Sequence, residues 1–350
     1  MPSQRRNTAA GGSEGLCMPP SDHNAGGLGS TGRRTRESCT LEARFQGVPM
    51  PISVRSACSA LLAAALLAVC ASLAPVAARE KAAVAAPAAG AEAWLADVTA
   101  ISSAADNAGR RAAIESALAA SGLKAERKPF AIDKREGVNL FADVGGPADA
   151  PLLLIGAHSD KVEAGRGATD NASGSAAVLA LAQRLKQRPL QHHRVRVAFW
   201  DLEELGLLGS RAYVADGKDK PALYVNFDVF GWGDALWMQT LDEAHPLVAA
   251  SRSATETSGI ALNAGKAYPP TDHLAFQKAG WPAVSYSLVG RSEISGILDE
   301  FAGKKVDPAP KVMQVIHSDN DTLAQLDATE AAKGVDAVEA ALRVWDADSR

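Results

Sequence analysis

The chain has 350 residues, of which 47% are hydrophobic and 22% charged, and its formal net charge is −4 at pH 7. A mildly acidic chain without a run of basic residues is a poor binder of nucleic acid, so the composition argues against that class of function. The length suits one α/β domain with a sizeable core, once two N-terminal segments are set aside.

These two segments differ in composition from the rest of the chain. Residues 1–49 are rich in Gly, Ser and Arg and show no apolar periodicity, which predicts disorder or an extension upstream of a true start at Met50. Residues 50–78 follow the layout of a signal peptide, with a basic Arg55, an apolar stretch over 57–73 and a small-residue cleavage site. We therefore expect an exported protein, periplasmic or secreted, without a stable membrane span in its mature form. The alternative is an uncleaved N-terminal anchor.

The cysteines also divide the chain at this point. All four precede residue 79, at Cys17, Cys39, Cys58 and Cys70. A mature chain of residues 79–350 would then have neither a disulfide nor a thiolate metal site. We expect these residues to form a single domain.

From Trp94 onwards, apolar runs alternate with Ala-rich helical runs. One or two helices are predicted over 94–121, and further helices over 173–187, 207–215, 248–257, 272–278 and 328–345. Strands are predicted over 139–144, 152–157, 195–200, 222–227 and 283–287. Mostly apolar strands, most of them followed by a helix, predict an α/β fold. Its central sheet is expected to be mixed but mostly parallel, with helices on both faces.

Histidine and carboxylate side chains follow three of the predicted strands. His158 comes directly after the strand at 152–157, Glu203 and Glu204 come shortly after the strand at 195–200, and Asp228 follows the strand at 222–227. Ligands collect at the carboxyl ends of the strands in such a sheet, so one pocket would gather these groups.

Two more candidates lie elsewhere, Asp170 before a predicted helix and His317 near the C-terminus. Singly, each has a plainer interpretation, such as a helix cap for Asp170 or a solvated helix start for the glutamates. Carboxylates gathered in one cleft repel each other and lose hydration, however, so a positive partner is needed. Imidazole and carboxylate ligands without cysteine suit a divalent metal of the zinc class.

The number of candidate ligands predicts two metal ions. A tetrahedral catalytic site takes three protein ligands and a water, so five ligands serve two sites if one carboxylate bridges. The five candidates are His158, Asp170, Glu204, Asp228 and His317. Glu203 is then left beside the metals, where a general base is needed.

Five motifs occur in the order and spacing of a known family. They are HSD from His158, GATDNASG from Gly167, EELGLLGS from Glu203, NFD from Asn226 and IHSDNDT from Ile316. Together they resemble the co-catalytic zinc aminopeptidases of clan MH, which include bacterial leucyl aminopeptidase and aminopeptidases S and Y. The similarity covers roughly 118–345. It implies the zinc exopeptidase fold, which is phosphorylase/hydrolase-like, and two Zn²⁺ ions per chain.

The resemblance also implies a role for each metal ligand. It places His158 and Asp228 on one zinc, Glu204 and His317 on the other, and Asp170 between the two. It further implies a cis peptide bond between Asp170 and the residue after it.

Further roles are implied for residues that do not bind metal. Glu203 would be the general base and acid, Asp160 would orient His158, and Asp321 would support the loop of His317. Tyr268, four residues before the Asp of YPPTDH, would help to polarise the scissile carbonyl, or alternatively would line the pocket as an aromatic side chain.

The expected function is hydrolysis of the N-terminal peptide bond of peptides, by a water that the metals activate and Glu203 deprotonates. Peptides are therefore the expected partners, and nothing in the sequence indicates an oligomeric state. One alternative is a glutaminyl cyclase, although such relatives tend to have Trp where this chain has Ile316. A second is a clan MH carboxypeptidase, for which Arg166 or Arg291 could bind the substrate carboxylate. A third is a binding protein of the same fold, which would be expected to have lost ligands.

Overall fold

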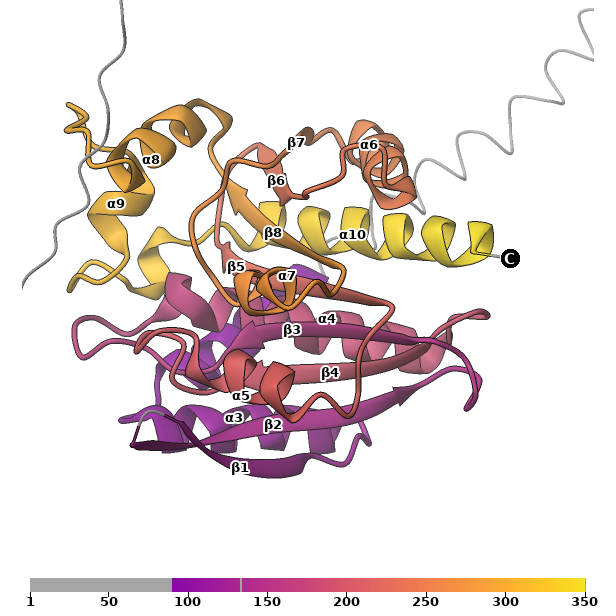
Figure 1. The fold of residues 1–350 in the computed structure, drawn as a ribbon. Coiled ribbons are helices and arrows are strands. Elements are labelled where there is room, and N and C mark those ends of the chain that lie inside the picture. The colour runs from indigo at the N-terminus through magenta and orange to yellow at the C-terminus, as the bar shows by residue number, and fades with distance from the viewer. Residues whose placement is uncertain (1–89, 133, 350) are drawn as a thin grey trace, which may run out of the picture. The chain divides into compact units, whose positions relative to one another are not determined.

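We describe the fold from a computed structural model, which covers residues 90–132 and 134–349. Eight strands form a single sheet in the order β1-β2-β4-β3-β5-β8-β6-β7 (Figure 1). Their bounds are β1 Glu126–Ile132, β2 Arg135–Gly145, β3 Leu152–His158, β4 Arg194–Trp200, β5 Leu223–Phe230, β6 Ala235–Gln239, β7 Ala261–Gly265 and β8 Ala283–Val289. The predicted signal peptide and upstream extension lie outside the described residues.

The centre of the sheet is parallel and its margins are mixed. Strands β4, β3, β5 and β8 lie side by side in this order, and each adjacent pair among them is parallel. Strand β6 also pairs in parallel with β7. The pairs β1 with β2, β2 with β4, and β6 with β8 are antiparallel. All seven residues of β3 are buried, as expected of a central strand covered on both faces. The predicted mixed, mostly parallel sheet is confirmed.

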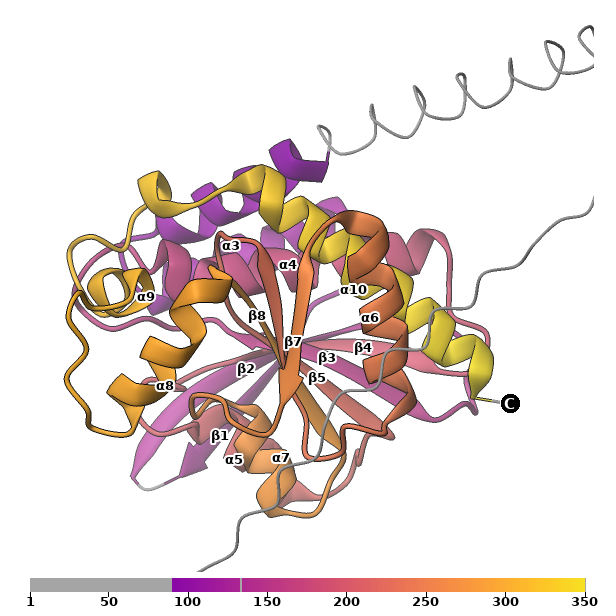
Figure 2. The ribbon, with the colours of Figure 1, turned by 90° about the horizontal axis from the view of Figure 1, so that it is seen from above.

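Helices cover both faces of this sheet. One face carries α3 (Asn107–Ala120), α4 (Ser173–Gln187), α6 (Pro246–Ser258) and α10 (Ala328–Asp348), and the other carries α5 (Leu208–Asp216) and α7 (His273–Lys278) (Figure 2). Two short helices, α8 (Ile294–Phe301) and α9 (Lys311–Val315), lie at one end of the sheet (Figure 1). No helix within the described stretches has both the length and the apolar character needed to span a bilayer.

The predicted strands all exist, but three further strands were missed. β1 is a margin strand whose residues alternate between exposed and partly buried, and it contains Pro129. A polar edge strand of this kind lacks the apolar run that marks a buried strand. β6 and β7 are short, and α8 and α9 were also missed. The predicted helical region over 94–121 is two helices, one at 90–102 and α3, separated by a short turn.

Strand register brings the predicted site residues to one edge of the sheet. His158, the last residue of β3, lies beside Trp200, the last residue of β4. Gly156 of β3 lies beside Asn226 of β5, so Asp228 comes level with His158 on the other side. The carboxyl ends of β3, β4 and β5 therefore meet, as expected for a parallel sheet, although Asp228 lies within β5 and not after it as predicted.

Candidate metal centre

Asp170 lies between the two histidines that the sequence singles out. Its Oδ1 is 3.0 Å from His158 Nε2, and its Oδ2 is 3.2 Å from His317 Nε2. Each carboxylate oxygen therefore faces a different imidazole. This is the arrangement that a carboxylate needs in order to bridge two metal ions.

A second carboxylate accompanies each histidine. Glu204 Oε2 is 3.0 Å from His317 Nε2, while Asp228 Oδ1 is 3.5 Å from His158 Nε2. The structure thus forms two groups of imidazole and carboxylate that share Asp170. Each group offers the three protein ligands of a catalytic zinc site.

Two buried ligand atoms of the cluster lack a hydrogen bond. Glu204 Oε1 and Asp228 Oδ1 are buried, and within the described residues neither forms a hydrogen bond. Buried polar atoms are normally paired, so such exceptions require an explanation. Oxygen atoms directed into a shared space beside two imidazoles fit a bound divalent cation, so the residues present are suited to the predicted metals.

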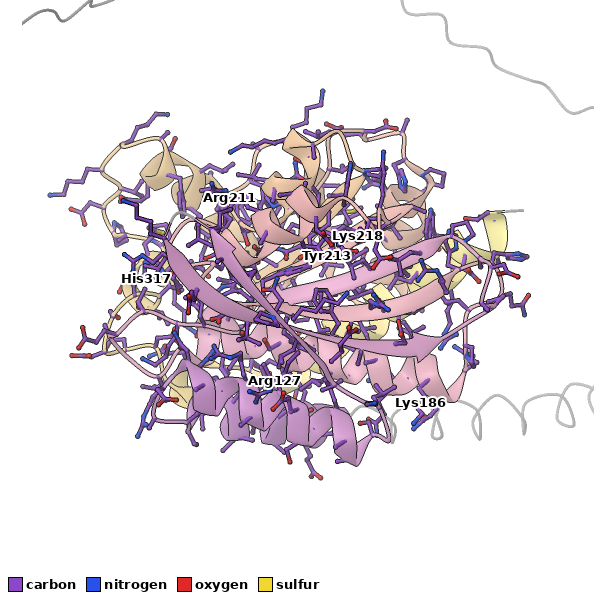
Figure 3. The ribbon with its side chains drawn as sticks, turned by 60° about the horizontal axis from the view of Figure 1, so that its bottom comes forward. Arg127, Lys186, Arg211, Tyr213, Lys218 and His317 are labelled. Atoms are coloured by element: carbon purple, nitrogen blue, oxygen red, sulfur yellow. The ribbon has the colours of Figure 1, made fainter. Side chains whose placement is uncertain are left out.

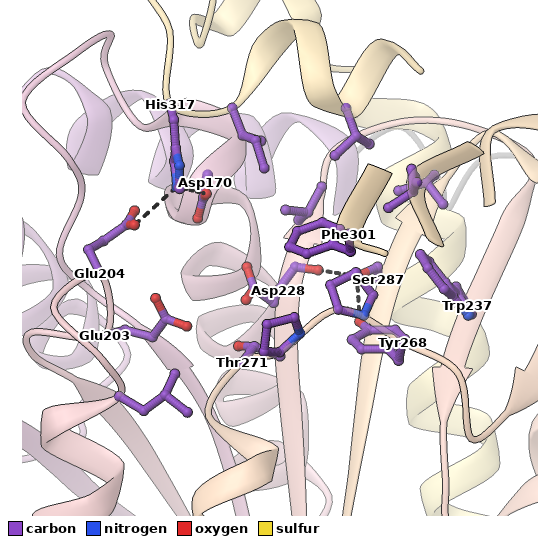
Figure 4. A pocket seen from close by; sticks show the side chains of 18 of the residues that line it. Asp170, Glu203, Glu204, Asp228, Trp237, Tyr268, Thr271, Ser287, Phe301 and His317 are labelled. Atoms are coloured by element: carbon purple, nitrogen blue, oxygen red, sulfur yellow. Dashed lines mark hydrogen bonds and ion pairs between the residues drawn. The ribbon is translucent and has the colours of Figure 1, made fainter. Parts of the chain in front are cut away.

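Glu203 lies at the same cluster, next to Glu204 in the sequence. One of its carboxylate oxygens lies within 4.8 Å of ligand atoms of His158 and Asp228. Figure 4 shows the carboxylates of Glu203, Glu204 and Asp228 directed toward a common space. By distance alone Glu203 could therefore serve as a ligand or as a base.

Asp160 connects this cluster to the backbone of the glutamates. Its Oδ1 lies 3.4 Å from His158 Nδ1 and accepts a hydrogen bond from the backbone N–H of Glu203 at 3.1 Å. Its Oδ2 accepts one from the N–H of Glu204 at 3.2 Å. Because Asp160 is 1% exposed, these interactions are shielded from water.

The side chain of Asp321 supports the loop of Asp170. Its carboxylate accepts hydrogen bonds from the backbone N–H groups of Thr169, at 2.6 Å, and Asp170, at 3.1 Å. Its backbone N–H donates to the carbonyl of Ser318 within the His317 loop, and the implied support of that loop by the Asp321 side chain stays a prediction. The peptide bond between Asp170 and Asn171 is cis, which confirms the expectation from the sequence.

Gly174, four residues after Asp170, lies close to the backbone of β5. A Cβ at Gly174 would meet Asn171 Oδ1 and the carbonyl oxygen of Phe227. Asn171 uses that oxygen to accept from the Gly174 N–H and its amide to donate to the Phe227 carbonyl. The absence of a side chain at Gly174 thus lets α4 start directly beneath β5.

Three residues that are candidate site residues or their direct neighbours in the chain have left-handed backbone conformations without being glycine. They are Leu202 (φ 59°), Val229 (φ 53°) and His317 (φ 56°). Such conformations are uncommon for these residue types and gather at functional sites. Two of them directly adjoin a candidate site residue, and the third is itself a candidate.

The titrating groups of the cluster are strongly perturbed. Burial disfavours the charged form of His158, but nearby carboxylates, Glu203 foremost, outweigh it and raise its pKa well above the ordinary value. Hydrogen bonds with Asp170 and Glu204 raise the pKa of His317 to about 10. Burial by itself would raise the pKa of Asp170. Its hydrogen bonds with the two histidines outweigh burial, so the pKa of Asp170 is lowered. The histidines thus supply positive charge that a bound cation would otherwise supply.

Glu203 and Glu204 have raised pKa values. Burial is the main cause for both, and for Glu203 it is opposed by His158 and reinforced by other carboxylates, including Asp272 and Asp228. A carboxyl whose pKa is raised well above its usual value is suited to exchange protons near neutral pH.

An apolar recess adjoins the carboxylates. The cavity has a volume of about 370 Å³, and Asp170, Glu203, Glu204, Asp228 and His317 form one side of it. Its other side is largely aliphatic and aromatic and is formed by Trp237, Val289, Ile297, Phe301, Val312 and Ile316. Figure 4 shows Trp237 and Phe301 at the end of the cavity away from Glu204. The sequence missed this wall because its residues come mainly from β6, α8 and α9, elements that were not predicted.

Tyr268 also borders the cavity, with its hydroxyl directed toward β8. It forms a hydrogen bond of 2.5 Å with Ser287 and accepts one from Ser285 at 3.3 Å. Ser287 in turn donates to the backbone carbonyl of Asp228. Because Ser287 uses its only hydrogen there, Tyr268 donates to Ser287 (Figure 4). Its predicted role toward a substrate carbonyl stays a prediction.

Similarity to known proteins agrees with this geometry. The profile of peptidase family M28 matches residues 139–342. Leupeptin-inactivating enzyme 1 of Streptomyces exfoliatus is 36% identical over 205 residues, which are 52% of this chain and 46% of that protein. Leucine aminopeptidase 2 of Trichophyton equinum is 30% identical over 217 residues, 55% of this chain and 42% of that protein. The matched part thus spans less than half of each relative.

Among the solved structures that resemble this chain, some share its fold at low sequence identity. Glutaminyl cyclase of Porphyromonas gingivalis superposes with a TM-score of 0.58 at 16% identity, covering 74% of this chain and 98% of that one. At this level of identity the comparison supports the fold alone.

Proposed function

The chain belongs to peptidase family M28, and from this premise we propose that it is a two-zinc aminopeptidase, which removes single residues from the N-termini of peptides. The observation that carries the proposal is the position of Asp170, with one oxygen toward His158 and the other toward His317. A carboxylate shared between two imidazole-containing groups is what a pair of adjacent hydrolytic metal ions requires.

Five residues would hold the two ions. His158 and Asp228 would bind one, Glu204 and His317 would bind the other, and Asp170 would bind both. Support comes from the buried oxygens of Glu204 and Asp228 that form no hydrogen bond within the described residues, and from the match of donor types to zinc. When bound, the ions supply Lewis acidity, which lowers the pKa of water and polarises a carbonyl.

Glu203 would move the proton in this reaction. Its carboxylate would take a proton from the attacking water and then deliver it to the nitrogen of the leaving amine. The raised pKa of Glu203 supports this role, because the proton must be both accepted and released. Asp160 holds the Glu203 backbone N–H and would thereby orient the base.

The apolar recess would take the side chain of the N-terminal residue. Trp237, Ile297 and Phe301 offer it apolar surface, which would favour large aliphatic or aromatic residues over small or charged ones. A charged side chain placed there would lose its hydration without a partner.

Peptide hydrolysis by the purified chain tests the proposal against its alternatives. The substrates are a peptide with N-terminal Leu, its N-acetylated form and a peptide with N-terminal Gln, each with zinc or with a chelator. We expect mass spectrometry to show release of the first residue from both free peptides, with zinc only. The acetylated peptide should stay intact.

Other products would point to another function. Loss of ammonia from the Gln peptide, without cleavage, would indicate a glutaminyl cyclase. Release of a residue from the other end would indicate a carboxypeptidase. No reaction with any peptide, despite bound zinc, would indicate a binding protein and would contradict the proposal.

A further inference from the structure

Arg110 is a buried charged residue that lies outside both the predicted site and the segment matching family M28. It is 0% exposed and stands on the inner stripe of α3, in series with Ile114 and Leu118 at helical spacing. An arginine is almost never fully buried unless its charge and its donors are satisfied. Its position in an otherwise apolar stripe therefore requires a specific reason.

The guanidinium of Arg110 binds three backbone carbonyls of one loop. Nε donates to Ser159 at 2.8 Å, Nη1 to Arg166 at 3.0 Å and Nη2 to Gly167 at 3.1 Å. In the described part of the chain Arg110 makes no ion pair. Its planar donors are therefore used for the backbone, a geometry that a lysine cannot reproduce.

These carbonyls belong to the two ends of the loop between β3 and α4. Ser159 directly follows the candidate ligand His158, while Arg166 and Gly167 lead into Asp170. Arg110 therefore joins the start of the loop to its end. A second residue of α3 acts nearby, because Asn107 accepts from the Lys161 N–H at 3.1 Å.

The charge of Arg110 also faces the carboxylate cluster. Burial lowers its pKa to about 10, while Asp160, Asp170, Asp321 and Glu204 oppose that shift, so the side chain stays cationic at neutral pH. A buried positive charge at this place would by itself disfavour a bound metal cation. The charge and the hydrogen bonds thus have opposite expected effects on metal affinity.

We propose that Arg110 is a positioning residue of the metal centre, which sets the spacing of His158 and Asp170 by tying together the two ends of their loop. The inference rests on the proposed zinc site but not on the proposed peptidase reaction. If wild-type protein bound no zinc, the proposed function would fail. If wild type and variants bound zinc equally, only the role of Arg110 would fail.

Zinc affinity of four full-length proteins tests the proposal. They are wild type, Arg110→Lys, Arg110→Met and the control Arg127→Met. Arg127 of β1 forms an exposed ion pair with Glu115 of α3, at 2.5 Å, and is drawn well apart from His317 in Figure 3. Dissociation constants come from competition with a fluorescent chelator. The visible absorption of the Co²⁺-substituted proteins reports the geometry of the ligands.

We expect both Arg110 variants to bind zinc about 10- to 100-fold more weakly, the range typical of residues that hold metal ligands in place. Their Co²⁺ spectra should change, because the ligand spacing changes. Arg127→Met should match wild type in both measurements, since it touches neither end of the loop.

Three results would overturn the proposal. One is unchanged zinc affinity in both Arg110 variants. Another is tighter binding by Arg110→Met with no change in Arg110→Lys, which would show that only the charge matters. The third is failure of both variants to fold, which would show that Arg110 serves the fold and not the metal centre. If only Arg110→Met fails to fold, zinc binding by Arg110→Lys decides.

Discussion

Asp160 and Glu203 are joined by a hydrogen bond of 3.1 Å, from the backbone N–H of Glu203 to Oδ1 of Asp160. The same oxygen lies 3.4 Å from Nδ1 of His158, and the other oxygen accepts from the N–H of Glu204. One buried carboxylate thus links the loop after β3 to the loop after β4. It connects an expected metal ligand with the expected general base.

Asp160→Asn should therefore weaken metal binding and slow catalysis together. The variant keeps the size of the side chain but removes the charge that supports the His158 imidazole, and an effect of about 10- to 100-fold on zinc affinity is expected. Chelator competition and peptide hydrolysis measure the two effects. Asp143→Asn is the matched control, because Asp143 lies on β2 and pairs there with Arg196 of β4. Zinc affinity equal to that of the control would contradict the link.

Glu203→Gln should keep both metals and lose most of its activity. The change removes the base but leaves the five expected ligands in place, and loss of a general base typically costs about 10²- to 10⁴-fold in rate. Metal analysis and kcat measured on the same preparation check this. Glu204→Gln should behave differently and lose metal. If Glu203→Gln lost zinc, the roles of the two glutamates would have to be exchanged.

The pH dependence of stability should reveal the interactions of His317. Its pKa is raised from 6.5 to about 10 by Asp170 and Glu204, so protonated His317 stabilises the fold of the chelator-treated protein. That contribution is fully present below pH 6.5 and is lost as the pH rises through about 10.

Melting temperatures of wild type and His317→Ala in chelator should therefore differ most below pH 6.5 and converge above about pH 10. A gap that stayed constant with pH would show that protonation of His317 does not stabilise the fold. With zinc bound, the pattern should change, because the metal replaces the proton on the imidazole.

Phe301→Ala should weaken the preference of the enzyme for peptides with a large N-terminal residue. Phe301 lines the apolar recess yet is 47% exposed, so its removal should leave the fold intact. Loss of about 1 kcal/mol of apolar contact would lower kcat/KM for a Leu peptide about fivefold and leave an Ala peptide unchanged.

The matched control for this change is Leu241→Ala. Leu241 is 54% exposed and does not line the recess, so its variant should treat the two peptides as wild type does. An equal loss for the Leu and Ala peptides in Phe301→Ala would place the N-terminal side chain elsewhere.

Three of the candidate ligands could be located because they lie at or after the end of a strand with a strong local signal. The strand that ends at His158 is fully apolar and fully buried, and the register beside Trp200 follows from parallel pairing. The motifs then located Asp170 and His317, whose positions depend on loops. Local sequence and motif spacing were enough for these residues.

The recess and Arg110 depend on contacts that local sequence does not contain. Ile297 and Phe301 reach the site through a short helix, α8, whose place is set by tertiary packing. Arg110 binds carbonyls 49 to 57 residues away in the chain. Its one local signal is a charged residue in the apolar stripe of Ile114 and Leu118, which periodicity alone does not explain.

Metal analysis of the dialysed, full-length protein tests the central claim most directly. We expect two zinc ions per chain, because Asp170 joins two groups of ligands. His158→Ala and His317→Ala should each hold less metal than wild type. A wild-type protein that holds one zinc ion or none would contradict the two-metal centre.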